Sequence, residues 1–410
     1  GQRIKRESGD RIAWFDRHFH WPEQPKMVSW EQKWEEYLSN EGSGTPYAQR
    51  MPASKDTVIP PKDLGEIGAA SRGYIGMIYA DGNNVGRVIA RLTTPEAYQQ
   101  QSRALDKASK NAVFHALSNH LEPHNGKHPF EILSIGGDDI LLIVPGKAAF
   151  AIALDIAHQF EYELRNKEAP APKHLADRYR GEVEQAQDFT AYTPQIGLSA
   201  GVVIAHENAP VFFLRDLVEE LLKNAKKLAR DRAKQQQFGG AVDFMVMKSI
   251  TMVTDKIKTF REEALGDGDK KNTPRRLTAR PYTWHEFAGL LATVQALQHE
   301  QFPRSQLYRL RRVMEEENST IVSTMEYLYT RLRLKAGNVL QQQIEAAWQG
   351  IPTQKGVSRR PVYPWLPYGD KGWETIWPDL IEMYDIVAMA QKNKQKSEEK
   401  AREETNVRNG

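Results

Sequence analysis

The sequence contains no cysteine, which excludes disulfide bonds, thiolate zinc sites and a cysteine nucleophile. It also has no apolar run long enough to cross a bilayer, so no membrane association is expected. Neither sign of charge dominates, because 56 Lys and Arg against 53 Asp and Glu leave a net charge of +3. Net charge therefore argues neither for nor against a nucleic-acid partner. The first residues lack the apolar region of a secretory signal, and we expect a cytoplasmic protein.

Tryptophan is absent from the middle of the chain. All nine tryptophans lie before residue 35 or after residue 283, which predicts a Trp-free central domain between two flanking regions. Large aromatic side chains make strong contacts, so the flanking regions are expected to pack on each other. Because 410 residues are many for one domain, we divide the chain into an N-terminal helical and extended segment (1–70), a central domain (71–252), a linker (253–279), a C-terminal helical domain (280–392) and a disordered tail (393–410).

Strand and helix patterns alternate along the central domain. Short apolar runs bounded by Gly, Pro and Asp predict strands, and apolar residues at helical spacing predict helices. The expected strands are residues 74–80, 130–135, 140–144, 196–204 and 242–247. The expected helices are a stretch after the first strand that is broken at 93–95 and resumes to about 121, then 147–164 and 214–234. This β-α-β-β-α-β-α-β order predicts an α+β fold, a ferredoxin-like palm followed by an α-helical domain.

Three aspartates stand where this topology brings strand ends together. Asp81 follows the first expected strand, and Asp138 and Asp139 occupy the turn between the second and third. The first strand and this hairpin are neighbours in a palm, so the three carboxylates are expected to converge. Clustered oxygen ligands suit Mg²⁺ or Mn²⁺, and two such ions can promote attack of a ribose hydroxyl on an α-phosphate. The alternative is a plain hairpin turn, because turns favour Gly and Asp.

Glycines and asparagines beside these aspartates would leave room for a nucleotide. Gly136 and Gly137 carry no side chain and permit positive φ, so a base or sugar could lie against the turn. Gly82, Asn83 and Asn84 precede an expected helix, and N–H groups at a helix N-terminus bind phosphate. The same residues also cap ordinary helices.

A lysine on the expected helix 214–234 completes the candidate site. Lys226 lies one helix away from the expected metal position, and it could hold the β- and γ-phosphates of a nucleotide. The alternative is that it belongs to a hydrated basic helix face.

These motifs occur in the order seen in one protein family. They are Tyr-Ala-Asp-Gly-Asn at 79–83, Gly-Gly-Asp-Asp at 136–139, Gly-Leu-Ser-Ala-Gly-Val-Val-Ile at 197–204 with His206 and Pro210, Ala-Lys at 225–226, Val-Asp-Phe at 242–244 and Leu-Thr-Ala-Arg-Pro-Tyr at 277–282. Over about residues 70–390 the chain resembles the large subunit of type III CRISPR effector complexes, in its second Palm domain and the helical domain that follows. That Palm is a relative of the nucleotidyl cyclases.

The resemblance implies synthesis of cyclic oligoadenylates from ATP, triggered by target RNA bound in a complex that carries guide RNA. It implies two metal ions on the three aspartates, triphosphate on Lys226, and positions near the site for Ser199 and His206. Family activity usually needs two Palms around two ATP molecules, so this chain would require a second Palm or a second copy of itself.

Two other functions stay open. A diguanylate-cyclase-like enzyme would use GTP, but its turn usually continues Gly-Gly-Asp/Glu-Glu-Phe, whereas Ile140 follows Asp139 here. The other is a catalytically idle scaffold in a CRISPR ribonucleoprotein, in which the palm only supports the assembly and the helical domain binds RNA or partner subunits. The chain also departs from the family, whose members usually carry a zinc module with cysteines and a nuclease domain with a His-Asp dipeptide, because it has neither Cys nor that dipeptide. The intact aspartate set argues against the scaffold. Base preference cannot be derived from these residues, so ATP rests on the resemblance.

Overall fold

A computed structural model describes residues 29–52, 58–164, 196–234, 239–248, 275–299, 302–315, 365–368 and 372–389. Residues 166–193, most of the expected linker, the middle of the expected C-terminal domain and the expected tail therefore lie outside the described residues. Within them, no helix is both long and apolar enough to cross a membrane.

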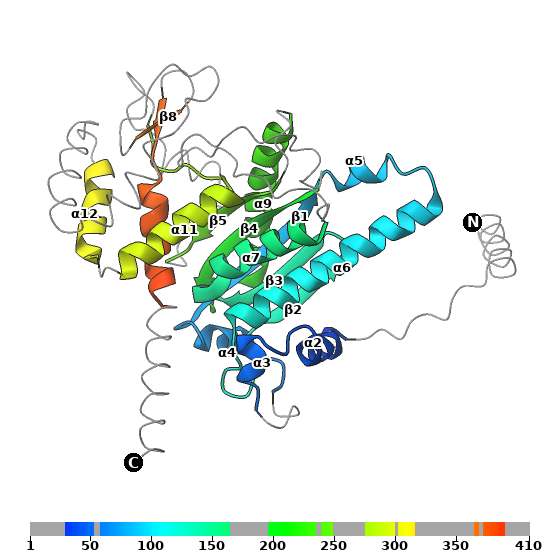
Figure 1. Cartoon of the computed structure of the whole chain (residues 1–410). Helices are drawn as coiled ribbons and strands as arrows, with labels where there is room; N and C mark the ends of the chain where they lie inside the picture. The colour runs from blue at the N-terminus through cyan, green and yellow to red at the C-terminus, as the bar shows by residue number, and fades with distance from the viewer. Residues whose placement is uncertain are drawn as a thin grey trace, which may run out of the picture.

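A six-stranded sheet with the order β2-β3-β1-β4-β5-β7 forms the centre of the molecule (Figure 1). Strand β1 pairs antiparallel with β3 and β4, β4 pairs parallel with β5, and β5 pairs antiparallel with β7. The strands are β1 (Tyr74–Asn83), β2 (Glu131–Gly136), β3 (Asp139–Pro145), β4 (Gly197–His206), β5 (Ala241–Val246) and β7 (Tyr282–Thr283). The expected palm topology is confirmed, and β7 extends it by one short strand.

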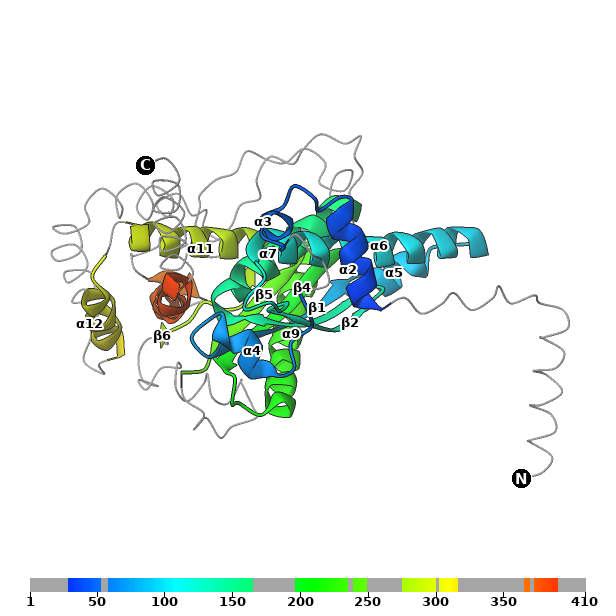
Figure 2. The ribbon, with the colours of Figure 1, turned by 90° about the horizontal axis from the view of Figure 1, so that it is seen from below.

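Helices cover both faces of this sheet, as Figure 2 shows. One face packs against α6 (Pro95–His120) and α7 (Gly146–Leu164), and the other against α9 (Val211–Ala233) and α4 (Leu64–Ala69). Along β1, Ile78 lies in the first of these cores and Met77 in the second, as the two-residue period of a strand requires. Burial on both faces explains why the strands appear as continuous apolar runs in the sequence.

The two tryptophan-rich flanks pack on the palm, each at its own edge. Trp34, in α2 (Trp30–Ser39), contacts Phe114 and Phe130 with ring centroids 5.6 and 5.3 Å apart. Trp284 begins α11 (Trp284–His299) on the other side. The expectation that the flanks pack on each other is therefore wrong for the described residues, because the palm core offers aromatic partners to both.

The C-terminal part is helical but also contains a small sheet that the sequence did not predict. Its helices are α11, α12 (Arg304–Glu315) and residues 377–389. Its sheet has the order β6-β9-β8. Those strands are only two or three residues long: β6 (Arg275–Arg276), β8 (Leu366–Tyr368) and β9 (Gly372–Glu374). Such short strands carry too little alternation to be recognised.

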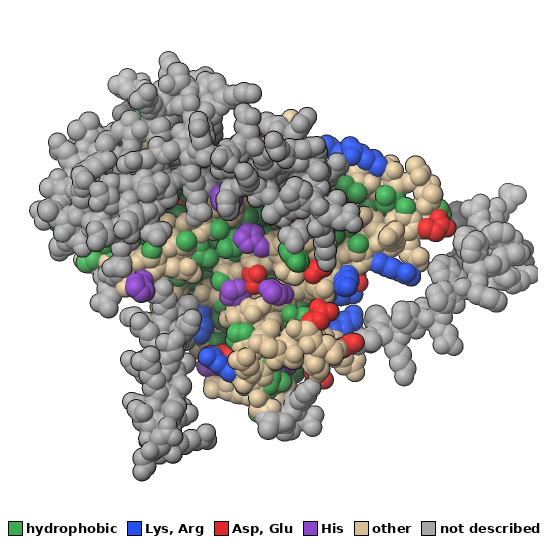
Figure 3. Space-filling view, viewed as in Figure 1, with side chains coloured by type: hydrophobic (Ala, Val, Ile, Leu, Met, Phe, Trp, Pro, Cys, Tyr) green, Lys and Arg blue, Asp and Glu red, His purple; other side chains and the backbone are tan. Residues whose placement is uncertain are grey.

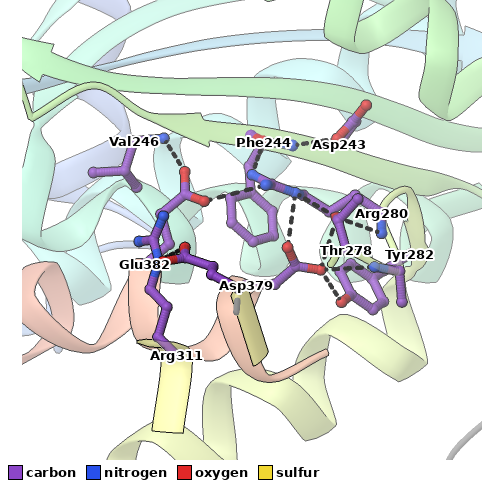
Figure 4. A network of polar contacts seen from close by, with 11 residues as sticks. Asp243, Phe244, Val246, Thr278, Arg280, Tyr282, Arg311, Asp379 and Glu382 are labelled. Atoms are coloured by element: carbon purple, nitrogen blue, oxygen red, sulfur yellow. Dashed lines mark hydrogen bonds and ion pairs between the residues drawn. The ribbon is translucent and has the colours of Figure 1, made fainter. Parts of the chain in front are cut away.

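A buried arginine joins this C-terminal part to β5 (Figure 4). Arg280 forms ion pairs with Asp379 and Glu382, each at 3.1 Å, and its Nη1 donates to the backbone oxygen of Phe244 at 2.7 Å. Glu382 in turn accepts a hydrogen bond from the N–H of Val246 at 2.6 Å. A buried charge of this kind is tolerated only when it is fully paired, so the network fixes the C-terminal helix against the palm.

Candidate active site

Two of the three aspartates face each other across neighbouring strands. Asp81 of β1 is the register partner of Asp139 of β3, and paired residues of antiparallel strands have Cα atoms about 4.5–5.5 Å apart. Strand β1 does not end at Ala80, as the sequence predicted, but runs through Asn83 because β4 pairs with it to that point. Asp81 is therefore held inside the sheet rather than in a loop.

Asp138 reaches the same place from the hairpin turn. Its Oδ2 would lie 2.6 Å from a Cβ atom at position 82, so a side chain at that position would displace the Asp138 carboxylate. Ser109 of α6 holds the turn in place, because its hydroxyl donates a hydrogen bond to the backbone oxygen of Gly137. The sequence carried no signal for Ser109, which is one of several small residues on the buried stripe of that helix.

The carboxylates lie in an environment that opposes their ionisation. Burial raises the pKa of both Asp138 and Asp139, and the negative charge of Asp81 raises it further. The ammonium of Lys226 forms an ion pair with Oδ2 of Asp81, and its charge acts in the opposite direction on the other two aspartates. The site thus brings three acidic groups together with one lysine.

This arrangement suits divalent cations in its chemistry. Oδ1 of Asp139 is buried and has no hydrogen-bond partner in the part of the chain that the structure describes, and oxygen donors are the ligands that Mg²⁺ and Mn²⁺ prefer. The side chains in their present conformations do not form a complete metal site, because no three acidic or histidine side chains of the described residues are arranged so that they could hold an ion together. The lysine already occupies one oxygen of Asp81, and an ion would have to displace it.

Histidines gather elsewhere on the surface around an acidic side chain (Figure 3). His115 and His120 of α6 lie 3.8 and 3.1 Å from the carboxylate of Asp155 in α7. This cluster lies on the α6–α7 surface and includes none of the three aspartates of the palm.

Open space lies above the Gly-Gly turn. Gly137 has φ +63°, and in the described part of the chain no atom beyond the adjacent residues lies within 4 Å of the position that a Cβ would take at Gly136 or Gly137. No other described residue therefore packs against these two positions of the turn.

Two residues that were expected near the site, Ser199 and His206, have a different setting from the expected one. Ser199 is fully buried, and its hydroxyl accepts hydrogen bonds from Asn83 Nδ2 at 2.8 Å and from the N–H of Ala241 at 3.2 Å. It thus supports Asn83 from within the protein. His206 pairs with Tyr74 at the opposite end of β1, seven residues from Ser199 and roughly 23 Å away along the strand. The expectation that His206 lies near the site is wrong.

The expected phosphate loop is shorter than the sequence predicted. Because β1 continues to Asn83, only Asn84 separates it from the helix α5 (Val85–Ile89). Asn84 adopts left-handed backbone angles, with φ 63°, and this sharp turn ends the strand. α5 has only five residues, so no phosphate site is assigned to its N-terminus.

The fold and these side chains define a class of protein. A palm with aspartates at the end of its first strand and in the adjoining hairpin turn belongs to the polymerase and nucleotidyl-cyclase type. The family model for Cas10/Cmr2, second palm domain, matches residues 74–234, which extend from the start of β1 to just past the end of α9. This segment is therefore a second palm of the Cas10/Cmr2 family, and the resemblance noted in the sequence is confirmed there.

The chain is also similar to several solved structures, but the sequence identity is low. No curated protein matches it. Csm1 of T. onnurineus is 15% identical with a TM-score of 0.42, over 80% of this chain and 40% of that one. Csm1–Csm4 cassettes in complex with one ATP and with cA4 are both 16% identical, with TM-scores of 0.43 and 0.40, and cover 80% of this chain. The chain matches only 37% and 38% of those two, so it spans about two fifths of each solved chain.

Proposed function

We propose that this chain is the catalytic Palm of a type III CRISPR effector and makes cyclic oligoadenylates from ATP. The observation that carries the proposal is the convergence of Asp81, Asp138 and Asp139 at one end of the sheet, inside the segment that matches the Cas10/Cmr2 palm. ATP as the nucleotide follows from the family resemblance.

Each residue of the site has a role in this proposal. The three aspartates would hold two Mg²⁺ or Mn²⁺ ions, which when bound would neutralise phosphate charge and activate a ribose hydroxyl. Gly136 and Gly137 leave space for the nucleotide, and Lys226 would turn from Asp81 toward the triphosphate. The hydroxyl attacks the α-phosphate and pyrophosphate leaves, so no protein nucleophile is required. Positioning supplies much of the rate.

The proposal includes partners. A second nucleotide must lie opposite the first for a phosphodiester bond to form between them. A second Palm, either another copy of this chain or a different chain, would hold it. Guide and target RNA would act through other effector subunits.

The test is mass spectrometry of the products after incubation of the chain with ATP and Mn²⁺. The matched variant is Asp138→Asn with Asp139→Asn, which keeps the shape of both side chains and removes their charge. An oligoadenylate made by the unchanged chain and not by the variant supports the proposal. Equal product from both would overturn the assignment of these aspartates, and product from GTP alone would favour the diguanylate-cyclase-like alternative.

The alternative of a catalytically idle scaffold predicts a different result in the same product measurements. It predicts no product from the unchanged chain, even when purified effector subunits and target RNA are added. It also predicts that the double variant assembles with those subunits as well as the unchanged chain does.

A further inference from the structure

Leu198 of β4 lies directly across the sheet from Gly82, between the partners of Asp81 and Asn83. The ladder from β4 to β5 begins two residues later, at Ala200. The backbone of Leu198 is therefore beyond the end of that ladder. Side chains from two other elements bind it there.

Glu161 of α7 binds the N–H side. Its Oε1 accepts hydrogen bonds from the N–H of Leu198 at 3.4 Å and from the N–H of Gly240 at 3.0 Å. One carboxylate oxygen thus joins the start of β4 to the residue just before β5. Backbone N–H groups in a buried setting need an acceptor, and here a side chain provides it in place of a strand.

Trp284 of α11 binds the C=O side. Its indole N–H donates to the backbone oxygen of Leu198 at 2.6 Å, and the side chain is buried. Packing around this contact is close, since a Cβ at position 240 would lie 1.6 Å from that same oxygen and 2.7 Å from the indole nitrogen. We call Glu161, Trp284, Leu198 and Gly240 the Leu198 clamp.

The clamp is continuous with the aspartate end of β1. Ser199, the next residue of β4, is the register partner of Asp81. Its hydroxyl binds both Asn83 and the N–H of Ala241, which follows the clamped Gly240. The strand end that carries Asp81 is thus tied to β4, and the start of β4 is tied to α7 and α11.

We propose that Glu161 and Trp284 are positioning residues that fix Asp81 by holding Leu198. The inference rests on the proposed function, because the proposed metal binding by Asp81 is the reason why the position of this side chain would have to be fixed. It also extends the site beyond the matched palm, because Trp284 lies outside residues 74–234. The C-terminal part would then contribute to the geometry of the aspartate cluster and not only to the stability of the fold.

The first test compares two tryptophan substitutions in the full chain. Trp284→Phe removes the indole N–H and keeps an aromatic ring. Trp34→Phe is its control, because Trp34 is fully buried and its indole nitrogen has no hydrogen-bond partner among the described residues. Amide hydrogen exchange of residues 79–84 is measured in both, relative to residues 214–221 of α9, whose buried side chains lie in the core on the other face of the sheet, away from both tryptophans.

Trp284→Phe should raise the relative exchange of residues 79–84 by about tenfold, the effect of one lost buried hydrogen bond. Trp34→Phe should leave this ratio unchanged. If the exchange ratio is the same in the two variants, the proposed role of the Leu198 clamp is overturned.

The second test uses the acid and a binding measurement. Glu161→Gln keeps an oxygen acceptor, whereas Glu161→Leu removes it, and the affinity for Mn²⁺ is measured by electron paramagnetic resonance. Glu161→Leu and Trp284→Phe should weaken Mn²⁺ binding about three- to tenfold, while Glu161→Gln and Trp34→Phe stay close to the unchanged chain. A purely structural role would lower the melting temperature of Glu161→Leu and leave Mn²⁺ affinity unchanged, and that result would overturn the positioning role.

These measurements do not require turnover. If the unchanged chain makes no product even with the effector subunits and target RNA, the proposed function fails, and the exchange and Mn²⁺ measurements still decide whether the clamp positions Asp81.

Discussion

The ammonium of Lys226 pairs with Asp81 and brings one positive charge into a cluster of three carboxylates. Both side chains are about one third exposed or less, at 27% and 32%. The lysine therefore takes the position of a counter-ion when no metal is present. A metal ion that binds Asp81 has to compete with it, and the released lysine is then available for phosphate.

We predict that Lys226→Met binds Mn²⁺ more tightly than the unchanged chain does. A partly exposed ion pair contributes up to ~1 kcal/mol, so the expected gain is about fivefold. The apparent affinity for ATP should fall in the same variant, because the phosphate ligand is lost. Lys227→Met is the matched control, since Lys227 is the next residue and is exposed. Equal effects of the two substitutions would show that only overall charge matters.

A second prediction concerns the cost of keeping Asp139 charged. Burial and the charge of Asp81 raise its pKa, and its Oδ1 has no hydrogen-bond partner within the described structure. Asp139→Asn should therefore stabilise the metal-free protein, by roughly 2–4 °C in melting temperature if ~1 kcal/mol of repulsion is relieved. Product formation should be lost in the same variant.

The control for this measurement is Asp106→Asn, on the exposed part of α6, where the aspartate pairs with Lys110. It should lower the melting temperature slightly or leave it unchanged. Addition of Mn²⁺ should stabilise the unchanged chain and not Asp139→Asn. A lower melting temperature for Asp139→Asn in the absence of metal would contradict the prediction.

The sequence was sufficient for the sheet and its hairpin, since strand periodicity and the Gly-Gly-Asp-Asp turn are local signals. It was insufficient where pairing between strands overrides the turn preference of a short segment. Asp-Gly-Asn at 81–83 is typical of a turn, yet β3 and β4 flank β1 and keep Asp81 in the ladder while β4 holds Gly82 and Asn83. The position of Asp81 was predicted, but its strand conformation was not.

The supporting residues of the site were not predictable from local patterns. Glu161 appears in the sequence as an ordinary acidic residue of an amphipathic helix, and its partner Leu198 is 37 residues away. Trp284 contacts Leu198 from 86 residues away. Ser199 was expected near the site, but only the structure shows that it is buried and binds Asn83.

A third prediction follows from the ionisation of Glu161. Burial raises its pKa to about 7, against the favourable effect of the two N–H groups that it accepts from. A carboxyl with a raised pKa in the folded state favours the protonated form, so its contribution to stability is greatest at low pH and is lost as the pH rises through 7. The melting temperature of the unchanged chain, relative to Glu161→Gln, should therefore fall between pH 5 and pH 8.

The matched control is Glu163→Gln, two residues further along α7, which should follow the pH dependence of the unchanged chain. Thermal unfolding at closely spaced pH values is the measurement. If Glu161→Gln shows the same pH dependence as the unchanged chain, another group is responsible for it.

The last prediction concerns the contact between Gly82 and Asp138. A Cβ at position 82 would lie 2.6 Å from Oδ2 of Asp138 and 2.6 Å from the side chain of Val85, closer than atoms can approach. Gly82→Ala should therefore push the Asp138 carboxylate away from Asp81 and weaken Mn²⁺ binding by about tenfold or more, a loss of at least ~1.4 kcal/mol. Product formation should fall in parallel.

Gly86→Ala is the control, because a Cβ there meets no atom of the described residues within 4 Å and the residue lies in a helix. It should leave Mn²⁺ binding unchanged and stabilise the protein by up to ~1 kcal/mol, because alanine restricts the unfolded chain. The comparison separates the contact from the general effect of replacing a glycine near the site. Tight Mn²⁺ binding by Gly82→Ala would mean that Asp138 does not take part in the metal site, and the proposed role of the hairpin turn would have to be abandoned.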